Sequence, residues 1–139
     1  MQANAVDQLA NRYMSEGRLA EFEQALTSID RSALSAPERE TWWHLYGIEA
    51  FRTERDAEAL RRFEEGLQHF PDSQPIRFSL GQQCIRLGQV DRAFELFKQC
   101  QFPDVSREFL LAQCRYAYLW DRYADGLTML RPLLKAFMT

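Results

Sequence analysis

Residues 47–63 read GIEAFRTERDAEALRRF and residues 81–97 read GQQCIRLGQVDRAFELF, so one pattern returns after 34 residues. Four residue types occupy matching places, namely Gly47, Arg52, Ala59 and Phe63 in the first stretch and Gly81, Arg86, Ala93 and Phe97 in the second. A repeat of this length holds two helices and cannot bury its apolar face alone, so copies stack into a solenoid with one long, shallow groove. The spacing therefore predicts a helical repeat protein, and it favours binding over chemistry.

Helical periodicity of apolar residues runs through nearly the whole chain, and no stretch keeps the period-two alternation of a strand. The predicted fold is all-α, with eight helices in four antiparallel pairs. We expect the helices at residues 3–15, 18–30, 37–52, 56–69, 74–86, 90–101, 105–119 and 122–137. The chain of 139 residues is long enough to bury a core without disulfides or metals. A single domain over residues 1–139 is expected, with repeats near 3–36, 40–73, 74–106 and 107–139.

Capping signals support these boundaries. Ser35-Ala36-Pro37-Glu38 is a capping box with proline in the first helical turn. Phe70-Pro71-Asp72-Ser73 and Phe102-Pro103-Asp104 should each end one helix, with Asp or Ser capping the next. These two turns lie 32 residues apart instead of 34, which leaves the register of the last repeat open by one residue. Residues 31–35 are predicted to be an irregular insertion.

These residues resemble the tetratricopeptide repeat family. The second repeat supplies Trp43, Tyr46, Gly47, Ala50, Ala59, Phe63 and Pro71, and the third supplies Leu80, Gly81, Cys84, Gly88, Ala93, Phe97 and Cys100. The resemblance implies a right-handed α-solenoid of about four pairs. Its small residues are expected to let the helices of a pair approach, with aromatic residues filling the space between neighbouring pairs. The first copy is weaker, because Phe22 stands where a small residue is usual, so its packing should be altered.

The resemblance also implies that the inner face of each first helix lines the groove. The candidate partner-binding residues are Asn11, His44, Ile48, Phe51, Arg52, Phe78, Gln82, Ile85, Arg86, Leu111, Arg115 and Tyr118. Arg52 and Arg86 hold equivalent places, and such a pair could bind acidic groups of a ligand beside apolar anchors. The alternative is that both arginines form salt bridges within the array. In this family the clamp for heat-shock chaperone tails uses lysines and asparagines, and only Asn11 fits it, since the other places hold Asp7, Leu45, Pro75 and Ser79.

Two further features of the chain have competing interpretations. Trp42 follows a different face from the core residue Trp43, so it should pack on the first repeat or point into solvent. Glu58, Glu64 and Glu65 alternate with arginines at helical spacing, which predicts a solvated face with ion pairs.

The predicted last helix is apolar on more than one side, although such arrays normally end in a polar cap. Leu130, Leu134 and Phe137 are its candidate self-association residues, and Pro132 should kink it. An apolar flank of this kind has to be covered. Either the chain pairs with itself or a partner through this helix, or residues 1–139 are a fragment of a longer chain.

Other function classes find little support. The net charge is −3 without a strong basic stripe, which argues against nucleic acid, and no apolar run is long enough for a membrane span. The two histidines have no metal-ligand spacing, and no phosphate loop or nucleophile elbow appears, so no catalytic residue, metal or cofactor is expected. Cys84, Cys100 and Cys114 should be buried free thiols in a reducing, cytoplasmic compartment.

The sequence therefore predicts a non-catalytic module that binds a peptide or helix of a partner protein in its groove. Two alternatives stay open. One is a self-associating scaffold segment of a larger protein, forming a homodimer through the last helix. The other is a chaperone of the bacterial secretion type, since small acidic repeat proteins of that class hold export substrates.

Overall fold

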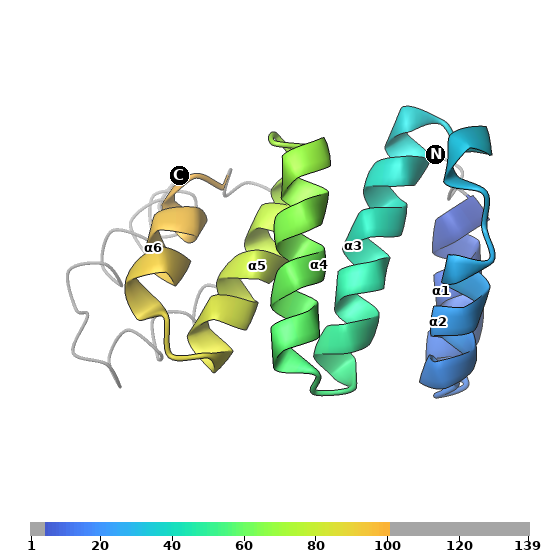
Figure 1. Ribbon diagram of the computed structural model, residues 1–139, viewed down its shortest axis with the longest axis horizontal. Helices are drawn as coiled ribbons and strands as arrows, with labels where there is room; N and C mark the ends of the chain where they lie inside the picture. The colour runs from blue at the N-terminus through green and yellow to red at the C-terminus, as the bar shows by residue number, and fades with distance from the viewer. Residues whose placement is uncertain (1–4, 101–139) are drawn as a thin grey trace, which may run out of the picture.

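The computed structural model describes residues 5–100, and this part of the chain is all helical. The helices are α1 (Ala5–Ser15), α2 (Leu19–Thr27), α3 (Ala36–Arg52), α4 (Asp56–His69), α5 (Gln74–Arg86) and α6 (Val90–Lys98), with a 3-10 turn η1 (Arg31–Ala33) before α3. Figure 1 shows α1 and α2 at one end of a row in which α3, α4, α5 and α6 follow in chain order. The solenoid predicted from the repeat is confirmed for three pairs. The helices expected at 105–119 and 122–137 lie outside the described residues.

The helix starts use the predicted caps. Ser35 and Glu38 form the full capping box: the Glu38 amide donates to Ser35 Oγ at 3.3 Å, and the Ser35 amide donates to Glu38 Oε1 at 3.1 Å. After Phe70 the cap is Ser73, whose hydroxyl accepts from the Ile76 amide, while Asp72 stays exposed. Each cap satisfies an amide that the first turn leaves without a helical partner.

The turn inside each pair has the same backbone geometry three times. Gly17, Glu54 and Gly88 all have positive φ, at 68°, 60° and 79°. At each turn the next residue donates its amide five positions back, as Arg18 does to Tyr13 O at 2.9 Å, Arg55 to Ala50 O at 3.0 Å and Gln89 to Cys84 O at 2.8 Å. This is the Schellman cap, and we call it the pair joint. The pair joint allows the three repeats to be aligned on their structure. Glu54 follows Gly17 by 37 residues, and Gly88 follows Glu54 by 34.

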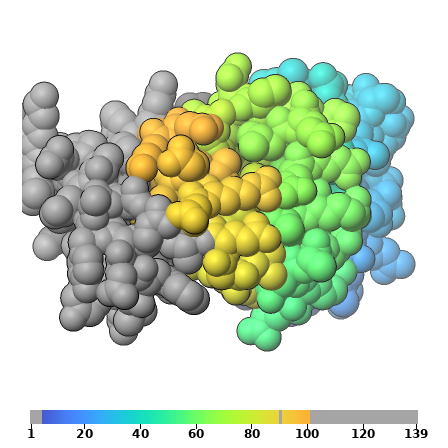
Figure 2. All heavy atoms as spheres, turned by 60° about the vertical axis from the view of Figure 1, so that its left-hand side comes forward, coloured from blue at the N-terminus to red at the C-terminus, as the bar shows by residue number. Residues whose placement is uncertain are grey.

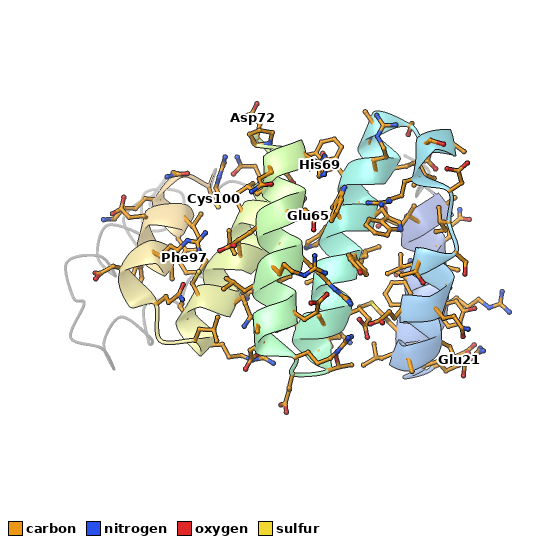
Figure 3. All side chains as sticks on the ribbon, viewed as in Figure 1. Glu21, Glu65, His69, Asp72, Phe97 and Cys100 are labelled. Atoms are coloured by element: carbon orange, nitrogen blue, oxygen red, sulfur yellow. The ribbon has the colours of Figure 1, made fainter. Side chains whose placement is uncertain are left out.

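Within the second and third pairs, a phenylalanine lies directly on a glycine. A Cβ added at Gly47 would lie 2.3 Å from Phe63, and one added at Gly81 would lie 2.4 Å from Phe97. Figure 3 marks Phe97 on α6, the helix that packs against Gly81 of α5. The expectation that such aromatics fill the space between neighbouring pairs is wrong for these two rings, because glycine leaves room for a ring inside its own pair.

The first pair is packed with other residues, which confirms that its packing is altered around Phe22. Seven residues before the joint stands Ala10 instead of glycine, and nine residues after it stands Leu26 instead of phenylalanine. The large ring has moved one turn earlier, to Phe22, which is fully buried and stacks on Tyr13 with ring centroids 6.1 Å apart. The large side chain has therefore changed places with a smaller one nearby, so the total side-chain volume is kept. Packed cores tolerate substitutions that conserve volume best.

The turn η1 accounts for the longer first repeat and lies against two tryptophans. The Trp42 indole donates to Leu26 O at 2.9 Å, which confirms that Trp42 packs on the first pair. The Arg31 guanidinium lies 4.5 Å from the centroid of the Trp42 ring and 5.1 Å from that of Trp43. On the other side Trp43 stacks with His69, which Figure 3 marks near the end of α4. The insertion thus covers an aromatic cluster with a cation.

A cluster of buried charges joins the first two pairs. Arg62 is 3% exposed and donates to Glu49, itself 1% exposed, at 2.8 Å, and to Glu23 of α2 at 3.2 Å. Arg55 bridges the same two carboxylates. The prediction of a solvated face holds for Arg61, which pairs with Glu58 and Glu65 on the surface, and is wrong for Arg62. Periodicity alone did not show that Arg62 turns inward, where its charge is matched by carboxylates.

The two described cysteines follow the prediction of buried free thiols. Cys84 and Cys100 are both buried and unbridged, and burial raises the pKa of each thiol. They pack as small apolar residues. Cys114 lies outside the described residues.

Candidate binding face

The pair joints place the predicted groove residues in rows across α1, α3 and α5. Each row holds the residues that lie the same number of positions before the positive-φ residue of their pair joint. The row ten positions before the joint holds Asp7, His44 and Phe78, and the row six positions before it holds Asn11, Ile48 and Gln82. The row three positions before the joint holds Met14, Phe51 and Ile85, and the row two positions before it holds Ser15, Arg52 and Arg86. We call these four rows the first-helix face. Helix α3 packs beside both α1 and α5, so the rows run across neighbouring helices. Leu111, Arg115 and Tyr118 lie outside the described residues.

The row three positions before the joint is apolar in all three pairs. Met14 and Phe51 are half-buried and pack against the core, and Ile85 is buried. Ile48, in the neighbouring row, is also half-buried. A row of this kind offers apolar area without opening the core, as the centre of a protein interface does.

The two candidate arginines have different surroundings. Arg86 Nε lies 3.0 Å from Asp56 Oδ1, and its Nη2 donates to Phe51 O at 2.7 Å. Its guanidinium also lies 4.0 Å from the centroid of the Phe51 ring. Arg52 is exposed and has no hydrogen bond or ion pair within residues 5–100. The alternative of an internal salt bridge is therefore correct for Arg86, and it fails for Arg52 in the described part of the chain.

His44 links two first helices. Its Nε2 lies 3.0 Å from Ser79 Oγ of α5, and burial lowers its pKa to about 4, with Asp7 of α1 acting in the opposite direction. The imidazole is thus neutral at pH 7 and serves as a hydrogen-bonding contact between repeats. Ser79 is buried, so this pair is not open to a substrate.

A hollow lies among α4, α5 and α6. It has a volume of 340 Å³ and is lined by Glu64, Leu67, Gln68, Leu80 and Arg92. Arg92 pairs with Glu64 across it at 2.5 Å. In Figure 2, side chains of the second pair lie directly against those of the third. Its lining combines that ion pair with Gln68 and two leucines from three packed helices, so it lies at the seam between the second and third repeats.

Neither a metal centre nor a membrane span is found in the described part. Residues 5–100 bring together no three His, Cys, Asp or Glu side chains that could hold a metal ion. None of the helices over the same residues combines the length and the apolar character needed to cross a bilayer.

Comparison with solved structures finds close matches of fold at low sequence identity. A tetratricopeptide repeat protein from Parabacteroides merdae ATCC 43184 matches 94% of this chain with a TM-score of 0.71 and 16% identity. MamA matches 95% of this chain with a TM-score of 0.67 and 14% identity. This chain has the tetratricopeptide-like fold. It spans about half of the first protein (53%) and 78% of MamA. No protein-family model and no curated protein matches the sequence.

Within this tetratricopeptide-like array, sequence reasoning missed two partners that decide the character of the face. Asp56 forms an ion pair with Arg86, and Ser79 forms a hydrogen bond with His44. The sequence contained a signal for the first of these. The residue two positions after the joint is Asp56 in the second repeat and Leu19 in the first, so only Arg86 has an acid at this position of the preceding repeat.

Proposed function

We propose that this chain is a non-catalytic interaction module that binds a peptide or helix of another protein across the first-helix face. The observation that carries the proposal is the apolar row of Met14, Phe51 and Ile85, which continues over three helices beside Ile48. Polar side chains border it on one side in Arg52 and on the other in Asn11 and Gln82. An apolar centre with a polar border is the anatomy of protein interfaces.

The chemistry of the described residues favours binding over catalysis. The two histidines are both engaged, since His44 is neutral and bonded to a buried hydroxyl and His69 stacks on Trp43. The buried carboxylate Glu49 and the half-buried Glu23 belong to the arginine cluster between the first two pairs. A general base must reach a proton of its substrate, and the hydrogen bond of His44 goes instead to the buried Ser79 hydroxyl.

The experiment is a selection of random 16-residue peptides by display on the immobilised protein, followed by affinity measurements. The face variant is Ile48→Glu with Gln82→Glu. The matched control, Gln24→Glu with Ala57→Glu, adds the same charge at exposed positions of the second helices α2 and α4. All three proteins must show equal helicity by circular dichroism before they are compared.

The proposal expects peptides selected by the wild type to bind the face variant about tenfold more weakly or worse, since an apolar contact is replaced by a buried charge. The control should bind as the wild type does. If no peptide is selected, or if both variants bind equally well, the proposed function is overturned.

A further inference from the structure

Arg52 is a cation for which the described part of the chain supplies no partner, although it supplies one for the equivalent residue. Two positions before the third joint, Arg86 reaches back to the preceding repeat and finds Asp56 at 3.0 Å. Two positions before the second joint, Arg52 has Leu19 at the place that corresponds to Asp56. The nearest acid along its own helix, Glu49, is buried and bonded to Arg55 and Arg62. The guanidinium of Arg52 is thus exposed and unpaired within residues 5–100.

The repeat positions that correspond to the surroundings of Arg86 add an apolar component at Arg52. Phe51 precedes it, and Met14 and Leu19 of the first pair hold the positions that correspond to Phe51 and Asp56 of the second. Met14, Leu19 and Phe51 are all half-buried. The Arg86 contact shows which ligands this position accepts: a carboxylate at the guanidinium Nε and an aromatic ring under its plane. Guanidinium groups prefer such planar, charged acceptors.

We propose that Arg52 is the anchor for an acidic side chain of the partner, and that this acid lies beside an apolar residue that packs on Phe51 and Met14. The partner carboxylate takes at Arg52 the role that Asp56 takes at Arg86. Arg86 is a structural residue of the array and does not bind the partner's acid. This inference rests on the proposed function and specifies the chemistry of the partner segment.

The test uses peptides selected from the random display library, taken first as a population. Asp and Glu should be enriched beside Leu, Ile, Phe or Met relative to the starting library. The best acidic peptide is then synthesised together with its amide version, in which Asp or Glu becomes Asn or Gln. Binding of the acidic peptide should weaken between about 0.05 M and 0.5 M NaCl, and binding of the amide version should change little.

Three protein variants separate Arg52 from general charge effects. Arg52→Glu should weaken binding of the acidic peptide about tenfold or more, and binding of the amide version much less. Arg12→Glu, an exposed change of the same charge on α1, should leave both affinities near the wild-type values. Leu19→Asp places an acid at the position that corresponds to Asp56. The new carboxylate should pair with Arg52 and so weaken the binding of acidic peptides without removing the arginine.

The outcomes distinguish this inference from the proposed function. If peptides bind the first-helix face without acid enrichment, or if Arg52→Glu and Arg12→Glu act alike, the acidic anchor is wrong and the binding face stands. If no peptide is selected at all, both are overturned. An Arg52→Glu effect on the acidic peptide alone, repeated by Leu19→Asp, supports the anchor.

Discussion

Arg62 and Glu49 form an ion pair in the interior, with Nη1 and Oε2 2.8 Å apart and neither side chain more than 3% exposed. The pair lies at the seam between the first two repeats, where Glu23 and Arg55 complete a cluster of alternating charges. In the third pair the equivalent positions hold Gln83 and Leu96. The same backbone geometry therefore accommodates either a charged or a neutral pair of side chains at these two positions.

Removing one partner of this pair should cost far more than replacing both. Glu49→Gln should lower the free energy of unfolding by about 3–5 kcal/mol, because it leaves Arg62 buried with less opposing charge. Adding Arg62→Leu, which copies the third pair, should recover a large part of that loss. Urea unfolding of the two single variants and the double variant gives the coupling energy. Additive losses would show that the pair is not coupled.

The contact of Phe63 on Gly47 predicts a size-dependent rescue. Gly47→Ala should destabilise the protein by about 1–3 kcal/mol, since the new methyl group would overlap the ring. Phe63→Leu should restore stability in the Gly47→Ala background, because the first pair already combines Ala10 with Leu26. Thermal unfolding of both singles and the double variant checks this. A double variant less stable than either single would contradict it.

Glu54 adopts the left-handed conformation that glycine adopts at the two other joints. Glu54→Gly should raise the free energy of unfolding by about 1 kcal/mol, because a side chain is strained at φ 60°. Gly88→Ala is the reciprocal control and should lower it by a similar amount, since no atom of residues 5–100 lies within 4 Å of its Cβ and only the backbone conformation differs. Urea midpoints measure both. A lower midpoint for Glu54→Gly would mean that the Glu54 side chain stabilises the joint.

The half-buried His44 predicts a loss of stability in mild acid. Its pKa is about 4 in the folded protein and about 6.5 in an unfolded chain, so the unfolded state binds the extra proton between these values. Stability should be fully present above pH 6.5 and fall as the pH drops toward 4, by at most about 3 kcal/mol. His44→Phe, which copies Phe78 of the next repeat, should remove this part of the pH dependence. His69→Phe is the control at an exposed position and should leave it in place.

A second acid transition should appear at lower pH. Hydrogen bonds from Arg61, and then from Arg62, lower the pKa of Glu58 to about 2. The stability that these bonds contribute is present above the ordinary pKa of a glutamate and is lost as the pH falls from about 4.5 toward 2. Burial also raises the pKa of Glu49, which lies in the cluster with Glu23. Glu58→Gln should flatten the pH dependence of stability between about pH 4.5 and 2, and circular dichroism during acid titration measures it.

The sequence predicted the fold well because glycine and phenylalanine at fixed spacing leave few other ways to pack two helices. The positions of α3, α4 and α5, the capping box at Ser35 and the packing of Trp42 on the first pair all follow from such local rules. Charges were harder to place, since helical spacing gives Arg61 and Arg62 as neighbours without telling which one turns inward. The sequence predicted which residues make up the candidate face. It did not show that Arg86 is paired and Arg52 is not within residues 5–100, because this difference depends on a contact with the preceding repeat.

The pair joint also bears on how such a chain can lengthen. The joint at Glu54 and the joint at Gly88 place the chain in the same backbone conformation with the same hydrogen bonds, although the residues differ. A cut after each joint excises a unit, residues 55–88, whose two ends are interchangeable. The joints are therefore splice points, at which a tandem copy of that unit extends the array by one repeat without a new kind of turn.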